Sequence, residues 1–191
     1  MKQKVAIIGK GNVGAALKRG LDRAGYETKI TGRGGARAAA EWGEIVILAV
    51  PYSEVDTAAK ELGDAVRDKT VVDVTNPLTK EFGLAIGFTT SAAEEIQKKL
   101  PDAKVVKGFN TIFASCMDSG KVKDQQVSVP VAGDDGNARS AALQLARDIG
   151  FDAIDAGPLS NARWIEALGY LNIQLGFMQK MGTDIGFKLV H

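Results

Sequence analysis

The first stretch of the chain that could do chemistry is Gly9-Lys10-Gly11-Asn12-Val13-Gly14, which matches the pattern G-x-G-x-x-G. Apolar residues typical of a strand, 5–8, precede it, and apolar residues at helical spacing follow it. In such a strand–loop–helix unit the glycines permit a tight turn, and the helix N-terminus presents N–H groups to the pyrophosphate of a dinucleotide. Alone the pattern is weak, and an ordinary turn is the alternative, but its context favours a dinucleotide site.

Two arginines follow the next apolar run. The run ends in Thr31-Gly32-Arg33, and Arg37 comes four residues after Arg33. Sites that prefer NAD carry an acid at the end of this second strand, which accepts hydrogen bonds from the ribose, but here no acid follows until Glu41. A guanidinium group instead forms charge-assisted hydrogen bonds with a 2′-phosphate, which a carboxylate would repel. Two arginines converging on one phosphate would indicate NADP(H); the alternative is two solvated surface arginines.

Short apolar runs alternate with helical patterns along nearly the whole chain. Strands are expected at residues 5–8, 27–31, 44–50, 70–74, 103–109, 127–133 and 151–157, and helices at residues 12–25, 36–42, 53–66, 91–100 and 136–149. Continuous apolar runs are typical of parallel strands buried on both faces. This alternation predicts an α/β fold with a doubly wound, mostly parallel sheet of the Rossmann type and right-handed crossovers.

The pattern changes after residue 158. Residues 160–181 are expected to form one long helix with apolar residues at heptad-like spacing: Trp164, Leu168, Leu171, Leu175 and Met178. Apolar residues on its other faces predict that most of its circumference is covered. We interpret residues 1–191 as a single dinucleotide-binding domain with residues 159–191 as a C-terminal helical extension. The helix either closes the sheet as a core element or forms a homodimer, and the sequence does not separate the two.

Composition excludes several classes of protein. A formal net charge of +1 argues against a nucleic-acid or anionic-membrane partner. One cysteine, Cys116, and one histidine, His191, can build neither an internal disulfide nor a zinc site, so no metal is predicted. No apolar run approaches the roughly 20 residues of a membrane span, and the N-terminus does not resemble a signal peptide. We therefore expect a cytoplasmic protein that acts on small molecules.

Segments spread over the chain resemble a known family. VAIIGKGNVG, TGRGGAR, LAVPYSEV, VVKGFNTI, VPVAGDD and DAGPLSNARWIEAL look like the NADPH-dependent F420 reductases, in the same order and over about residues 4–187. VVDVTNP and VVKGFNTI are also similar to the cytoplasmic NADPH-binding domain of the STEAP metalloreductases. The resemblance implies a protein that binds NADP(H) and exchanges a hydride with a deazaflavin.

The resemblance also implies roles for individual residues. By position, the residues that would hold the pyrophosphate are Gly9, Lys10, Gly11, Asn12, Val13 and Gly14. Those that would hold the 2′-phosphate are Thr31, Gly32, Arg33 and Arg37. The rest of the cofactor would contact Val50, Pro51, Tyr52, Thr75, Asn76 and Asn110. Thr111, Ile112 and Phe113 would bind the second substrate. Two departures from the family pattern matter: the pyrophosphate loop GKGN is one residue shorter than the archaeal GGTGN, and Phe113 replaces a proline at the wall where the deazaflavin would lie. Coenzyme F420, FMN, FAD or another flat acceptor therefore all stay open.

Such a hydride transfer needs few side chains, because the two cofactors carry the reaction. No catalytic residue is predicted. Asp73 is expected to cap a loop, and Lys104 and Lys107 are expected to be solvated, with an acidic F420 tail as an alternative partner. The leading interpretation is an NADP-dependent oxidoreductase with a deazaflavin or flavin-like acceptor. The alternatives are a soluble flavin or ferric reductase, and a non-catalytic NADP-binding protein that senses redox state.

Overall fold

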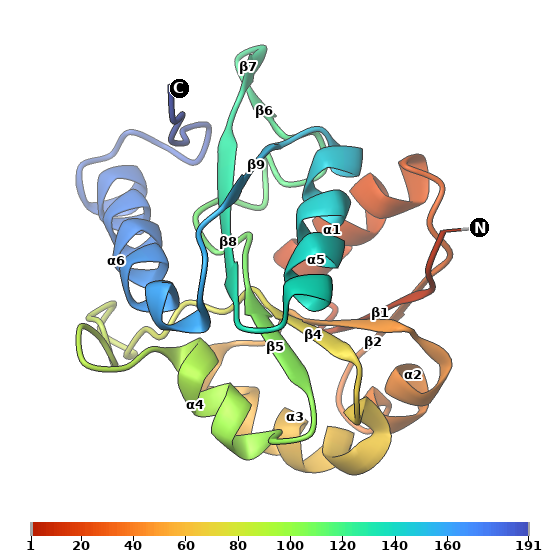
Figure 1. Ribbon diagram of the computed structural model, residues 1–191. Coiled ribbons are helices and arrows are strands. Elements are labelled where there is room, and N and C mark those ends of the chain that lie inside the picture. The colour runs from red at the N-terminus through yellow and green to blue at the C-terminus, as the bar shows by residue number, and fades with distance from the viewer. Residues whose placement is uncertain (1, 191) are drawn as a thin grey trace.

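A computed structural model describes residues 2–190, and its centre is one large sheet (Figure 1). The sheet has seven strands in the order β2-β1-β3-β4-β5-β8-β9. The strands are β1 (Val5–Ile8), β2 (Thr28–Thr31), β3 (Ile45–Leu48), β4 (Thr70–Asp73), β5 (Lys104–Lys107), β8 (Ser128–Gly133) and β9 (Asp152–Asp155). All neighbouring strands are parallel except β5 and β8. A small hairpin, β6 (Lys121–Val122) and β7 (Gln125–Gln126), precedes β8. The predicted α/β fold with a mostly parallel sheet is confirmed.

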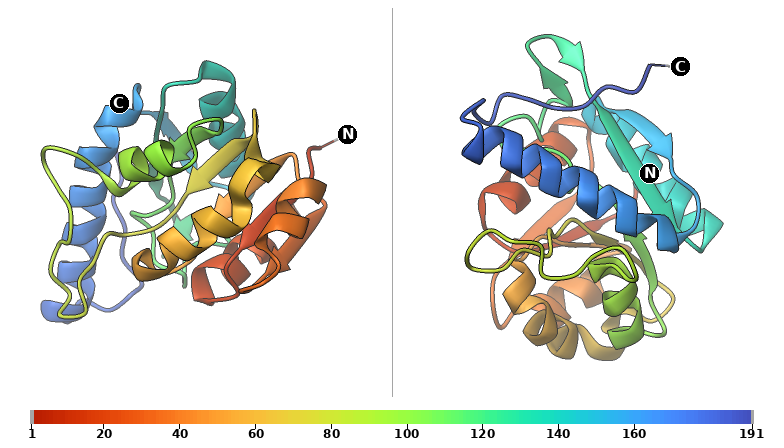
Figure 2. Two further views of the ribbon diagram at one scale, coloured as in Figure 1. Left: turned by 90° about the horizontal axis from the view of Figure 1, so that it is seen from below. Right: turned by 90° about the vertical axis from the view of Figure 1, so that its left-hand side faces the viewer.

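Helices cover both faces of the sheet (Figure 1). On one face lie α1 (Asn12–Arg23) and α5 (Gly136–Ile149). On the other lie α2 (Ala36–Trp42), α3 (Val55–Leu62) and α4 (Ala92–Lys99), with 3-10 turns at Tyr52–Glu54 and Gly63–Val66. The last helix, α6 (Ala162–Ile173), starts from a 3-10 turn at Leu159–Asn161 and continues as a π-helical turn, Gln174–Met178. It runs along the outside of the molecule, beside β8 and the loop that follows β4 (Figure 2).

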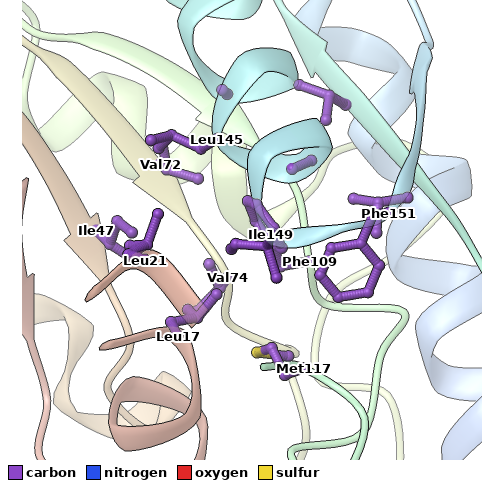
Figure 3. Close-up of a cluster of buried hydrophobic side chains, with 14 of the residues drawn as sticks. Leu17, Leu21, Ile47, Val72, Val74, Phe109, Met117, Leu145, Ile149 and Phe151 are labelled. Carbon is purple, nitrogen blue, oxygen red and sulfur yellow. The ribbon is translucent and has the colours of Figure 1, made fainter. Parts of the chain in front are cut away.

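The core consists of two apolar layers, one on each face of the sheet. Val5 and Ile7 of β1 belong to the layer under α1 and α5, and Ala6 and Ile8 belong to the opposite layer. Figure 3 shows the first layer, where leucines of α1 and Ile149 of α5 gather around side chains from β4 and the loop after it. Burial on both faces explains why the strands are continuous apolar runs in the sequence.

The order of the strands opens a crevice at one edge of the sheet. β1 lies between β2 and β3. The chain therefore forms β2 on one side of β1 and then crosses over to form β3 on the other side. In open α/β sheets the loops at the carboxyl ends of the strands diverge at this switch point, and ligands bind there. The glycine loop, which follows β1, and residues 49–54, which follow β3, are therefore the segments that border the crevice.

α6 differs from the long, covered helix that the sequence predicts. Helical structure ends at Met178 rather than at residue 181. Its buried residues are mostly small or polar: Ala162, Ile165, Glu166, Gly169, Asn172 and Gly176. Trp164, Leu171 and Met178 are 60%, 47% and 49% exposed, so the rest of the chain does not cover this face of the helix. The spacing of the apolar residues marked the outer face of the helix and not its inner face, because most residues on the inner face are small or polar.

Candidate functional site

The glycine loop makes a tight turn between β1 and α1. Gly9 has a φ of +125°, and a Cβ on it would lie 2.1 Å from the carbonyl oxygen of Ala49. A Cβ on Gly14 would lie 2.0 Å from the carbonyl oxygen of Gly9, so α1 packs directly on the turn. A Cβ on Gly11 would meet no atom within 4 Å, and α1 begins at the next residue, Asn12. The loop thus leaves open space in front of the N-terminal N–H groups of α1, as a pyrophosphate requires.

A cavity of about 240 Å³ extends from the glycine loop toward the end of β2. Its lining includes Gly9, Lys10, Gly11, Gly32, Arg33, Val50, Pro51, Glu54 and Glu61. A second cavity, of about 270 Å³, extends from the same loop in the other direction. It is lined by Gly11, Asn12, Val13, Ala49, Val50, Pro51, Tyr52, Val74, Thr75 and Asn76. The two cavities share Gly11, Ala49, Val50 and Pro51, and their combined lining contains most of the residues predicted to bind a dinucleotide.

The two predicted phosphate-binding arginines lie in different surroundings. Arg33 lines the first cavity, with its side chain 81% exposed, and forms an ion pair with Glu54. Arg37 forms ion pairs with Asp64 at 2.7 Å and with Glu41 at 3.1 Å, and it is not among the residues that line this cavity. The hydrogen bond and charge of Asp64 raise the pKa of Arg37 above its ordinary value. The structure therefore does not bring the two guanidinium groups together.

Two glutamates of this cavity were missed in the sequence. Glu54 pairs with Arg33, and the Glu61 carboxylate accepts hydrogen bonds from the backbone N–H groups of Gly34, at 3.2 Å, and Ala36, at 2.7 Å. They are seven residues apart, a spacing that places both on one face of a helical segment and could have indicated them. A 2′-phosphate in this cavity would have to compete with Glu54 for Arg33.

A third cavity, of about 440 Å³, lies on the other side of the α1 N-terminus. Its lining consists of Asn12, Ala15, Arg19, Phe113, Ala114, Ser115, Phe177 and Thr183. Phe113 and Phe177 meet edge to face, with ring centroids 5.6 Å apart. Asn12 also lines the second cavity, so the two are neighbours. Phe177 and Thr183 come from the C-terminal segment, and sequence reasoning missed them as site residues because they belong to no motif.

The predicted substrate-binding residues divide between this cavity and the interior. Phe113 lines the third cavity, whereas Thr111 and Ile112 are buried. Asn172 of α6 donates a hydrogen bond to the carbonyl oxygen of Thr111 at 3.0 Å. Asn110, also buried, donates through Nδ2 to Asn76 Oδ1 at 3.1 Å. The segment after β5 is thus held between the loop after β4 and α6, with only Phe113 of these four facing the third cavity.

Behind these loops lies a fully buried ion cluster. Lys107 Nζ is 2.8 Å from Asp73 Oδ2 and 3.0 Å from Glu166 Oε1, and all three side chains are at most 1% exposed. Lys107 also donates a hydrogen bond to the carbonyl oxygen of Thr75 at 2.6 Å. Burial lowers the pKa of Lys107, but the two carboxylates raise it by more, so its pKa lies above that of an ordinary lysine. We call Lys107, Asp73 and Glu166 the buried ion cluster.

The cluster corrects one expectation and confirms another. Lys107 was expected to be solvated, and this prediction is wrong. The residue is buried because it ends β5 in the centre of the sheet, where two carboxylates surround it. Lys104, at the start of the same strand, is partly exposed and lies 3.5 Å from Asp135. Asp73 does cap a loop, since its Oδ1 accepts a hydrogen bond from the N–H of Thr75 at 2.9 Å. Sequence reasoning missed Glu166, which comes from α6.

Polar groups lie in and beside the second cavity. Thr75 Oγ1 is buried without a hydrogen-bond partner, and so is Asn110 Oδ1. Thr75 lines the second cavity, next to Asn76. Buried polar atoms are normally paired, so an orphaned hydroxyl at a cavity wall marks a place where a polar ligand group can bind. The open space at Gly11 and the polar group at Thr75 thus lie along one cleft.

Residues 2–190 contain neither a metal site nor a membrane-spanning helix. No group of three or more His, Cys, Asp or Glu side chains in this range is arranged to hold a metal ion. Within the same range no helix has the length and apolar character needed to cross a membrane.

Comparison with known proteins agrees with this geometry. Residues 4–77 match the family model described as NADP oxidoreductase, coenzyme F420-dependent. The F420-dependent NADP reductase of Methanocaldococcus jannaschii is 33% identical over 174 residues, which are 86% of this chain and 76% of the archaeal one. A solved structure of a proposed F420-dependent NADP reductase from Arthrobacter sp. FB24 superposes with a TM-score of 0.91 at 28% identity, and the match covers 100% of both chains.

Metalloreductase STEAP3 of Rattus norvegicus is a further relative, 29% identical over 86% of this chain. The match covers only 36% of the length of that metalloreductase. Pyrroline carboxylate reductase of Plasmodium falciparum, solved with NADP bound, shares 12% identity and a TM-score of 0.63, over 94% of this chain and 68% of that one, which shows a common fold.

The fold and these relatives together define the class: an oxidoreductase with an NADP-binding Rossmann domain. Within that class, the chain belongs to the family of the F420-dependent NADP reductases, to which the STEAP metalloreductases are also related.

The buried ion cluster leads to a stability prediction. Lys107→Met removes the cation between two buried carboxylates, so we expect the free energy of unfolding to fall by about 3–5 kcal/mol near neutral pH. Because the pKa of Lys107 is raised in the folded chain, its contribution is present below the ordinary value of 10.5 and is lost as the pH rises through the folded value. Urea unfolding should therefore show a gap to the parent protein that narrows only in strong alkali.

Lys104→Met is the matched control, since this lysine is on the same strand but partly exposed. We expect it to change the free energy of unfolding by no more than about 0.5 kcal/mol. Equal effects of the two substitutions would contradict the importance given to the buried ion cluster.

Proposed function

We propose that this protein transfers a hydride between NADP(H) and a flat acceptor of the deazaflavin or flavin class. The observation that carries the proposal is the continuity of the cavities: the first two share Gly11, and the second and third share Asn12. A dinucleotide along the first two cavities would extend its nicotinamide end toward the third. The rings of Phe113 and Phe177 give the third cavity an aromatic wall suited to a flat ring.

The chain would contribute binding, orientation and exclusion of water. Bound NADP(H) supplies or accepts the hydride. The glycine loop and the α1 N-terminus would hold the pyrophosphate, and Arg33 the 2′-phosphate. Thr75 Oγ1 and Asn110 Oδ1 would orient the nicotinamide end, and Phe113 and Phe177 would hold the acceptor ring at the roughly 3–3.5 Å that hydride transfer requires. No acid or base is needed, which agrees with the absence of a predicted catalytic side chain.

The relationship to the STEAP metalloreductases supports a second candidate, a soluble flavin or ferric reductase. This activity would use the same NADP(H) cleft and differ in the acceptor. A non-catalytic redox sensor would bind NADPH and not oxidise it.

The acceptor can be identified by stopped-flow absorbance of NADPH with coenzyme F420, FMN, FAD and a ferric chelate offered in parallel. We expect rapid loss of the nicotinamide absorbance with a deazaflavin or a flavin. Turnover with the ferric chelate alone would favour the metalloreductase activity, and tight NADPH binding with no oxidation by any acceptor would favour the sensor.

The coenzyme preference depends on Arg33 in this proposal. Arg33→Asp replaces the guanidinium group by a carboxylate, and we expect NADPH binding to weaken by about 2–3 kcal/mol while NADH binding changes little or improves. Arg37→Ala should have a smaller effect, because Asp64 and Glu41 already hold that side chain. Isothermal titration calorimetry with both coenzymes measures this preference, and an unchanged ratio in the Arg33 variant would remove this residue from the site.

We also propose that the protein is a homodimer through the outer face of α6, and that it acts in the cytoplasm, where a lone cysteine stays reduced. Trp164, Leu171 and Met178 are exposed on α6. The only charged residues in 162–178 are Arg163 and Glu166, and both form ion pairs within the chain. An uncharged apolar face of this kind is complementary to a second copy of itself.

Sedimentation velocity tests this assembly. Leu171→Glu places a charge in the centre of the outer face of α6, so we expect a dimeric protein to become monomeric. Lys60→Glu, an exposed position on α3, is the control and should leave the sedimentation coefficient unchanged. A parent protein that sediments as a monomer would overturn the proposed dimer.

A further inference from the structure

α6 follows, residue by residue, the chain segment that comes after β5. At Gly169 the two are so close that a Cβ would lie 2.5 Å from Asn110 Nδ2. One turn later, Asn172 Nδ2 donates a hydrogen bond to the carbonyl oxygen of Thr111 at 3.0 Å. These buried positions lie on one side of the helix, so the register of α6 against this segment is defined by direct contacts.

The C-terminal end of this contact forms one wall of the third cavity. A Cβ on Gly176 would lie 2.6 Å from Phe113 Cζ. The next residue, Phe177, meets Phe113 edge to face, and both rings line the cavity. A displacement of α6 along its axis would therefore move Phe177 relative to Phe113 and change the space in which the proposed acceptor lies.

The other end of the contact is the buried ion cluster. Glu166 Oε1 is 3.0 Å from Lys107 Nζ, and its two oxygens also accept hydrogen bonds from the N–H groups of Ala92, at 2.9 Å, and Ala93, at 3.2 Å. One carboxylate thus joins α6 to the end of β5 and to the start of α4. Glu166 precedes Phe177 by three turns, about 16 Å at a rise of 1.5 Å per residue, so it cannot itself touch the acceptor.

The charges of the cluster fix this register more strictly than apolar contacts could. An apolar side chain such as Ile165 loses little when its neighbours slide past it. Lys107 and Glu166 are buried without access to water, so a shift that separates them leaves unpaired charges in the interior, which is costly. Only one position of α6 satisfies the carboxylate, the ammonium group and the two N–H groups together.

We propose that Glu166 is a positioning residue for the hydride transfer. Through Lys107 and the N-terminus of α4 it holds α6 in the register that sets the distance between the nicotinamide site and the acceptor wall at Phe177. The inference rests on the proposed function, because it concerns the geometry of that reaction.

The test is the single-turnover rate of hydride transfer, measured at saturating NADPH and FMN or coenzyme F420, whichever the parent protein reduces. Glu166→Gln keeps the size of the side chain and removes its charge. We expect the rate constant to fall by about 10-fold or more, since misplacement of reacting groups by 1 Å can cost about 100-fold. The Kd of NADPH should change by less than about 2-fold, because the first two cavities do not include α6.

Two further variants complete the experiment. Glu94→Gln removes a different tie between the same helices, the partly exposed ion pair of Glu94 with Arg163, at 2.6 Å, and should leave the rate constant unchanged. Gly169→Ala adds a methyl group that would lie 2.5 Å from Asn110 Nδ2 and 2.7 Å from Asn76 Oδ1. It should therefore disturb both the register of α6 and the proposed nicotinamide site, so that hydride transfer slows and NADPH binding weakens while the buried ion cluster stays intact. A single-turnover rate constant does not depend on how much of the sample is folded, so a merely structural role of Glu166 would not change it.

The outcomes separate the inference from the proposed function. Slow transfer in Glu166→Gln with NADPH binding preserved, together with a parental rate constant in Glu94→Gln, supports the positioning role. A parental rate constant in Glu166→Gln overturns it, even if the variant is less stable. Absence of hydride transfer to any acceptor in the parent protein overturns the proposed function itself and the positioning role with it.

Discussion

The pairing of one buried lysine with two buried carboxylates is the constraint on which the arrangement of the site depends. Lys107 ends β5, Asp73 ends β4, and Glu166 lies on α6. A cation at this depth requires both partners, because none of the three side chains is more than 1% exposed to solvent. The cluster therefore ties β4, β5 and α6 together, beside the hydrogen bonds that Asn110 and Asn172 form between the segments that follow these strands and α6. Apolar side chains could supply comparable stability, so the value of the charges lies in the unique geometry that they demand.

The opposite end of the cleft obeys a steric constraint instead. Gly9 and Gly14 are close enough to backbone oxygens that any side chain at either position would force the turn open. This contact brings the N-terminus of α1 to the carboxyl end of β3 and leaves space at Gly11. A phosphate group can then approach backbone N–H groups, which no charged side chain has to supply. The geometry at the glycine loop thus depends on the absence of side chains, whereas the geometry at the loops after β4 and β5 depends on the pairing of charged side chains.

The cavity between the glycine loop and the end of β2 contains opposite charges. Arg33 pairs with Glu54, and Glu61 occupies the N–H groups of Gly34 and Ala36. An incoming 2′-phosphate would exchange one charge-assisted contact for another, so the net gain would be the difference between two favourable interactions. Such a balance allows selection for the phosphate without very tight binding, which suits a coenzyme that has to leave after each turnover.

The sequence by itself determined the α/β fold and the glycine loop, because both depend on residues that are neighbours in the chain: apolar runs of strand length, and glycines between a strand and a helix. It also indicated the family through motifs of the same local kind. Only the tertiary structure decided that Lys107 is buried, that α6 turns a polar face inward, and that Arg33 and Arg37 point to different partners. A lysine or a glutamate looks solvated in a sequence, and its true surroundings depend on which distant elements cross beside it. Local patterns carry no information about such crossings, since packing in three dimensions alone brings β4, β5 and α6 to one point.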